Sequence, residues 1–202
     1  MDSNIKQEKC EFCGQHVPRY STIYVAPEKE YLCSCLTCFN KRMAEYSGTD
    51  LEHVDFEPII LKDNRGVEHE FHFTIRHIGD RVGIVSFEIK DGHRGGYEFS
   101  LIGDIDKEIF DLFVKLFERM RRGLNRNHLE WDSNTNSWQV SKDDVVRARI
   151  SSDLESDEDY GHPPLIVIDG TEFRWDEFGR MLMTYEGFHF KLELFDRSEE
   201  MP

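Results

Sequence analysis

The chain of 202 residues is acidic, with 25 lysines and arginines against 40 aspartates and glutamates and a net charge of −15. This charge argues against binding of the whole surface to nucleic acid or to an anionic membrane, and no stretch approaches the ~18 uninterrupted apolar residues of a membrane helix. The N-terminus, Met1 to Lys9, is polar and lacks an apolar signal core. With 39% hydrophobic and 12% aromatic residues, we expect a globular cytoplasmic protein with a buried core.

The first forty residues contain all 5 cysteines of the chain. Cys10 and Cys13 have the C-x2-C spacing of a zinc knuckle, with Gly14 placed to take a positive φ, and Cys35 and Cys38 repeat the spacing. In a reducing compartment, cysteines clustered in this way bind metal rather than form disulfides. The sequence therefore predicts a zinc site with the ligands Cys10, Cys13, Cys35 and Cys38.

Cys33 is an alternative ligand. The spacer from Cys13 to Cys35 is slightly longer than the usual window of about 15–20 residues, whereas the spacer from Cys13 to Cys33 lies inside it. Cys33 with Cys38, or Cys33 with Cys35, is therefore an alternative second pair of zinc ligands.

The two knuckles, a hairpin through Ser21–Ala26 and Tyr31–Leu32, and a helix over Phe39–Tyr46 resemble the treble-clef and zinc-ribbon families over about the first fifty residues. Leu32–Arg42 is similar to the end of one treble-clef branch, the HNH nucleases. That resemblance implies an Asp-His pair on the hairpin, followed by an Asn and a His that hold a divalent ion. This chain has His16 alone between its cysteine pairs, without a neighbouring Asp, so we predict no catalytic residues here.

The residues after position 50 predict an α+β domain over 51–202, with 51–123 and 124–202 as its two halves. The first half has a four-stranded antiparallel pattern and an amphipathic helix over Asp106–Arg122 that Gly123 closes. Its predicted strands are Phe56–Lys62, Glu68–Ile78, Val82–Lys90 and Gly96–Leu101.

The second half alternates short strand patterns with turn residues. A helix over Trp175–Tyr185 precedes a final strand over Phe188–Phe195, in which apolar and polar residues alternate. Trp175–Gly187 resembles the tails of uncharacterised bacterial proteins, a likeness that implies no activity. The other predicted strands are His128–Trp131, Ser137–Val140, Val145–Ile150, Pro164–Ile168 and Thr171–Arg174.

The sequence thus predicts an α+β fold: a zinc-bound module over residues 1–50, and a mostly antiparallel sheet with two core helices over 51–202. Because four cysteines would fill a tetrahedral zinc ion, the ion would be structural. The function that follows is a non-catalytic binding or adaptor protein. The alternative is a nucleic-acid-associated protein or a degenerate relative of HNH nucleases.

Two charged clusters are candidate contact surfaces. A run of carboxylates inside the second half predicts contact with a basic protein partner, against the alternative of a solvated loop. A basic cluster at the end of the predicted helix, spanning Arg119–Arg126, is either an anion contact or a solvated helix end. The carboxylates are Asp153, Glu155, Asp157, Glu158 and Asp159.

Overall fold

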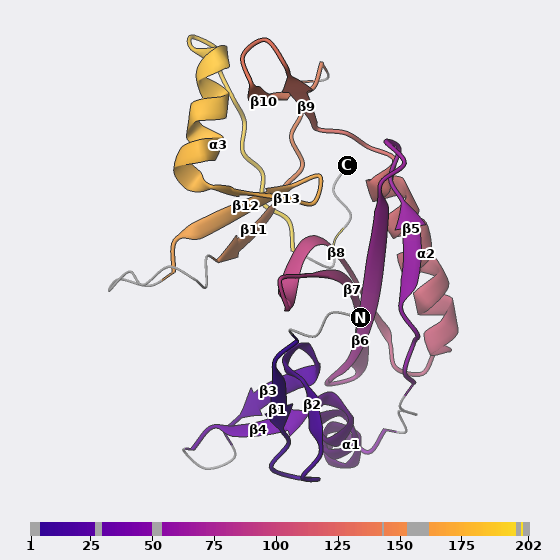
Figure 1. The fold of residues 1–202 in the computed structure, drawn as a ribbon. Coiled ribbons are helices and arrows are strands. Elements are labelled where there is room, and N and C mark those ends of the chain that lie inside the picture. Colours follow the sequence, from indigo (N-terminus) through magenta and orange to yellow (C-terminus); the bar gives the residue numbers. More distant parts are fainter. Residues whose placement is uncertain are drawn as a thin grey trace.

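The computed structural model describes residues 5–26, 30–49, 54–142, 144–152, 162–196 and 199. Figure 1 shows three parts: an N-terminal module of residues 5–49, a four-stranded sheet with a long helix, and a C-terminal unit that begins at residue 129. The described residues form three α-helices and otherwise antiparallel strands, so the α+β prediction is confirmed. The strands form several separate sheets, however, and not the one sheet that the sequence suggested.

The N-terminal module is built from two hairpins and a helix. Strand β1 (Gln7–Lys9) pairs with β2 (His16–Pro18), and the 3₁₀ turn η1 (Arg19–Ser21) leads to the second hairpin. There β3 (Thr22–Val25) pairs with β4 (Leu32–Cys35), and helix α1 (Leu36–Ser47) follows directly. The predicted hairpin and helix are therefore present.

The central sheet has the order β5-β6-β7-β8, with every pair antiparallel, as the meander pattern predicted. The strand β8 is longer than expected because Asp91 (φ 53) and Gly92 (φ 81) both have positive φ and form a two-residue hairpin turn. The predicted five-residue loop after Lys90 is therefore wrong. The strands are β5 (Ile59–Lys62), β6 (Glu68–Ile78), β7 (Arg81–Lys90) and β8 (His93–Asp104).

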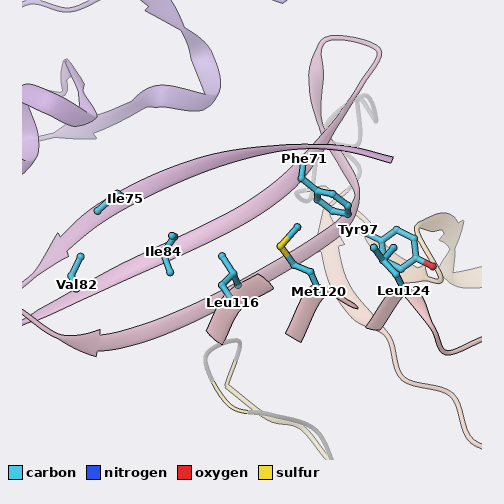
Figure 2. Close-up of a cluster of buried hydrophobic side chains, with 8 residues drawn as sticks. All are labelled: Phe71, Ile75, Val82, Ile84, Tyr97, Leu116, Met120 and Leu124. Atoms are coloured by element: carbon cyan, nitrogen blue, oxygen red, sulfur yellow. The ribbon is translucent and has the colours of Figure 1, made fainter. Parts of the chain in front are cut away.

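Helix α2 (Ile109–Leu124) covers one face of this sheet, and Figure 2 shows its side chains packed below the strands. The helix begins and ends later than the sequence predicted, and Gly123 lies inside its last turn. A Cβ atom at Gly123 would lie 2.4 Å from the ring of Phe99, so close packing, and not termination, explains this glycine. The buried core consists of Phe71, Ile75, Val82, Ile84, Tyr97, Leu116, Met120 and Leu124.

The C-terminal unit has its own core. The hairpin of β9 and β10 is closed by an edge-to-face contact between Trp131 and Trp138, with ring centres 5.3 Å apart. Helix α3 (Trp175–Leu182) continues into the 3₁₀ turn η2 (Met183–Tyr185). The buried residues are Leu129, Ile166, Ile168, Phe173 and Met181. The strands are β9 (Leu129–Asp132), β10 (Ser137–Val140), β11 (Arg149–Ser152), β12 (Pro164–Ile168) and β13 (Thr171–Arg174).

Two predicted strands of the second half are wrong in part or in full. Only the end of the pattern over Val145–Ile150 forms a strand, because pairing with β12 begins at Arg149. The predicted final strand, Phe188–Phe195, has no regular secondary structure. Alternation specifies two faces but supplies no neighbouring strand, and an unpaired strand is not stable by itself. The acidic run from Asp153 to Asp159 lies outside the described residues.

No helix among the described residues is both long and apolar enough to cross a membrane.

Candidate metal centre

Four cysteine sulfur atoms meet in the N-terminal module. The Sγ atoms of Cys10, Cys13, Cys35 and Cys38 all lie within 4.8 Å of one another, and those of Cys13 and Cys35 are 3.9 Å apart. All five cysteines of the chain are free thiols. The structure thus brings together the four residues that the spacing selected.

The first pair lies on a tight turn after β1. The N–H of Cys10 donates to the carbonyl of Gln15 (2.8 Å), and the N–H of Gly14 donates to the carbonyl of Cys10 (2.8 Å). Gly14 has a φ of 77°, as the knuckle prediction required. This turn aims both sulfur atoms of the pair at the same point.

The second pair lies where β4 passes into α1. Cys35 is the N-cap of the helix, and its sulfur accepts a hydrogen bond from the N–H of Cys38 (3.4 Å). Cys38 lies in the first helical turn, where the unpaired N–H groups and the helix dipole stabilise a thiolate. The strand-to-helix junction therefore presents two sulfur atoms beside backbone donors.

The surroundings of Cys10 favour its thiolate. Burial opposes ionisation, but the N–H groups of Cys35, Cys13 and Phe12 direct hydrogen bonds at the sulfur, and the pKa of Cys10 is lowered. The bond from Cys35 measures 3.2 Å. Burial raises the pKa of Cys35 and Cys38, and their thiol neighbours add to the increase at Cys38. A cation at the centre of the cluster would oppose this increase and favour both thiolates.

Cys33 lies outside the cluster. Its sulfur donates to the carboxylate of Glu8 (3.6 Å), which also accepts from the hydroxyls of Thr22 (3.1 Å) and Tyr24 (3.0 Å). The sulfur of Cys33 is not among those that lie within 4.8 Å of one another, and it faces Glu8 instead. The geometry favours Cys35 over Cys33 as the third ligand.

His16, the residue considered for nuclease chemistry, lies exposed on β2 opposite Lys9. In the parts of the chain that the structure describes, the four-cysteine cluster is the group of His, Cys, Asp or Glu side chains with metal-site geometry. His16 does not belong to it.

The basic cluster at the end of α2 divides into two parts. Arg121, Arg122 and Arg126 line an open depression of about 430 Å³ together with Glu118. Arg119 points elsewhere and donates to the carbonyl of Ser100 (2.7 Å). The depression therefore contains a carboxylate as well as three arginines.

The alternation along β6 places His69 on the same face as the buried Phe71 and Ile75, but it does not reveal the partners of the ring. Its Nδ1 lies 2.8 Å from Oε1 of Glu88, and its Nε2 lies 3.6 Å from Oδ2 of Asp63. The other oxygen of Glu88 accepts from the N–H of Tyr97 (2.7 Å). These side chains are buried. The alternation along β7 could have shown that Glu88 is buried, because Glu88 falls on the same face as the inward-pointing Ile84 and Ser86.

Comparison with known protein families gives two matches. Residues 52–125 match a domain of unknown function (DUF7686), and residues 128–199 match a second domain of unknown function (DUF7713). The first stretch contains the central sheet and α2, the second contains the C-terminal unit, and the cysteine module precedes both. No curated protein and no solved structure matches the chain.

Proposed function

We propose that this is a non-catalytic binding protein whose N-terminal module is held together by one structural zinc ion on Cys10, Cys13, Cys35 and Cys38. The convergence of the four sulfur atoms within 4.8 Å supports this most directly. Zn–S bonds of about 2.3 Å in a tetrahedron place sulfur atoms about 3.8 Å apart. The separation of 3.9 Å between Cys13 and Cys35 agrees with that value.

The donor set favours zinc among the common metals. Thiolates select zinc and other thiophilic ions, whereas magnesium and calcium take oxygen ligands. A module of two short hairpins and one helix also buries little apolar surface, so a metal ion supplies much of its folding free energy. We further propose that the hairpin-and-helix arrangement around the cysteines is of the treble-clef type.

A structural role follows from the number of ligands. Four protein thiolates complete the coordination of zinc and leave no position for water or a substrate. Catalysis at this centre is therefore not part of the proposal.

The adaptor role is supported by exposed apolar side chains near the C-terminus. Phe188, Phe190, Leu192 and Leu194 are 70–87% exposed and recur at every second residue. Apolar side chains grouped in this way mark interaction surfaces, and an unpaired segment with alternating apolar residues suits addition to the sheet edge of a partner protein. We propose such a partner for this segment, and a basic surface on it for the acidic run Asp153–Asp159.

Metal analysis of the purified protein tests the zinc proposal. We expect about one zinc per chain in the wild type, because the four sulfur atoms form one site. Cys13→Ser should lose the metal and unfold the module. Cys33→Ser is the matched control and should keep both the zinc ion and the folded module. Loss of zinc in Cys33→Ser with retention of zinc in Cys35→Ser would contradict the ligand assignment.

Affinity capture from the native cell tests the adaptor proposal. The bait is wild type or a chain with Asp153, Glu155, Asp157, Glu158 and Asp159 replaced by their amides. An electrostatic partner should be captured less by the neutralised chain and less at high salt, because exposed charges are screened over about 10 Å at 0.1 M. Identical capture by both chains would mean that the acidic run is only solvated.

A further inference from the structure

A groove of about 530 Å³ lies on the face of the central sheet opposite α2. Its floor follows from the strand register, which places Thr74, Val85 and Ser100 in one row and Arg76, Gly83 and Ile102 in the next. Thr74, Val85 and Ser100 have small side chains, whereas the side chain of Ile78 lies over Gly83, with its Cδ1 3.0 Å from the position of an added Cβ. The row of small residues therefore leaves space beside Ile78 on this face of the sheet.

The N-terminal module forms the second wall and is fixed to the sheet. The side chain of Asn40 on α1 is buried; it donates to the carbonyl of Ile75 (2.9 Å) and accepts from the N–H of His77 (2.9 Å). Arg94 of β8 donates to the carbonyl of Tyr20 (2.6 Å) from the other side. These bonds hold Tyr20, Ile23 and Leu36 of the module against the groove.

The charge of the groove is opposite to that of the protein. Arg19, Arg76, His93 and Arg94 line it, and no carboxylate does so among the described lining residues, although the chain carries 40 acidic residues. Arg94 lies 3.9 Å from the ring centre of Phe87 and donates to Thr74 (3.2 Å), which fixes its guanidinium at the groove. Because Arg19 is paired with Glu8 (3.5 Å), the positive charge that faces the groove comes from Arg76 and Arg94.

Arg76 is the arginine best placed for an anionic ligand. In the described part of the chain it forms no ion pair, and its contact is the ring of Phe39, 5.4 Å away. A guanidinium binds carboxylate or phosphate oxygens through two parallel N–H donors.

Aliphatic side chains make up a further part of the lining. Ile78 and Ile102 are 43% and 37% exposed and flank Arg76, while Ile23 and Leu36 face them from the module. Small-molecule sites typically have about 300–1,000 Å³, mostly apolar walls and a few placed polar groups. The groove has this size and this composition.

We propose that the groove binds a small amphipathic anion, with its carboxylate or phosphate head on Arg76 and Arg94 and its aliphatic body against Ile78 and Ile102. Binding of this ligand goes beyond the proposed function. It depends on that function only because the zinc-held module supplies one wall of the groove. The carboxylate and the phosphate ligand share one chemistry, which is a single anionic head on a short aliphatic body.

Titration calorimetry of the full chain with defined probes tests the proposal. Octanoate and octyl phosphate carry both halves of the ligand, octanol lacks the head, and acetate and inorganic phosphate lack the body. We expect one of the first two to bind at one per chain, and at least about tenfold more tightly than the probes lacking one half. The stronger of the two identifies the head. Equal binding of octanol, or no binding of any probe, overturns the proposal.

Two variants and a matched control locate the site. Arg76→Gln should weaken binding about tenfold or more, and Ile102→Asp, at a partly exposed position, should abolish it by placing a carboxylate in the groove. Arg81→Gln makes the same charge change on the same face of the sheet but outside the groove, and should bind as the wild type does. Equal weakening by Arg76→Gln and Arg81→Gln overturns the assignment.

Zinc content measured on the same samples separates the two proposals. A zinc-loaded protein that binds no probe contradicts the groove proposal alone. A zinc-free protein that binds octanoate through Arg76 contradicts the zinc proposal alone.

Discussion

At the scale of single residues, the buried Glu88 joins three elements of the central core. Its carboxylate bonds to the ring of His69 and to the backbone of Tyr97, and Asp63 lies on the other side of the same ring. The hydrogen bond that the His69 ring donates to the carboxylate of Glu88 raises the pKa of His69; burial opposes the increase, and the charges of Glu88 and Asp63 add to it. The charged pair is therefore favoured in the folded state.

Replacement of Glu88 tests this pair through its pH dependence. Because the folded pKa of His69 is raised, the pair contributes its full stability below the unfolded pKa near 6.5 and loses it as pH rises through the folded value. We expect Glu88→Gln to lower the free energy of unfolding by about 1.5–3 kcal/mol at pH 6, and by less at pH 9. Urea unfolding at the two pH values measures both quantities.

The control for Glu88→Gln is Glu70→Gln. Glu70 is 3.2 Å from His72 on the outer face, but its side chain is 58% exposed, so its loss should cost at most about 1 kcal/mol. A larger loss for Glu88→Gln at pH 9 than at pH 6 would refute the charged pair.

At the scale of elements, two helical glycines have opposite surroundings. A Cβ at Gly123 of α2 would lie 2.4 Å from the ring of Phe99, whereas Gly179 of α3 has nothing within 4 Å of that position. Gly179→Ala should stabilise the protein by up to about 1 kcal/mol through helix propensity. Gly123→Ala should destabilise it, because overpacking costs about 1–3 kcal/mol and outweighs the same gain. Thermal unfolding compares the two; stabilisation by Gly123→Ala would show that Phe99 moves aside freely.

The side chain of Asn40 connects α1 to two backbone groups of β6. Strand β5 pairs with β6 only as far as Phe71, and Asn40 satisfies the carbonyl of Ile75 and the N–H of His77 beyond that point. We expect Asn40→Ala to destabilise the protein by about 1–3 kcal/mol and to speed amide exchange at His77, because two buried backbone groups lose their partner. Asn64→Ala removes an exposed bond of 3.4 Å to Asn125 and serves as the control. Unchanged exchange at His77 would contradict this role.

The sequence predicted an element correctly where the residues that it pairs or packs with lie next to it in the chain. The meander was predictable because each strand pairs with the next one along the chain, and α1 because it begins within the second cysteine pair. The segment Phe188–Phe195 was not, since alternation alone does not specify a neighbouring strand. The partners of His69 were missed because they lie far from it in the chain: Glu88 comes from β7 and Asp63 from the turn after β5.

At the scale of the whole molecule, the hydrophobic cluster of the central sheet is formed without the N-terminal module. The buried core cluster is formed by β6, β7, β8 and α2, and it contains no residue of the module. We expect a strong chelator to unfold residues 5–49 and open the groove, while the sheet and α2 stay folded. Hydrogen exchange resolved along the chain measures this, and unfolding of both parts together would show that the core depends on the metal.

The central claim is that a zinc ion has four sulfur ligands from Cys10, Cys13, Cys35 and Cys38, and X-ray absorption at the zinc edge of the purified protein tests it most directly. The account predicts four sulfur atoms at about 2.3 Å, with no nitrogen or oxygen ligand, and an unchanged spectrum for Cys33→Ser. A nitrogen or oxygen atom in the zinc coordination shell, or a sulfur atom lost in Cys33→Ser, would contradict it.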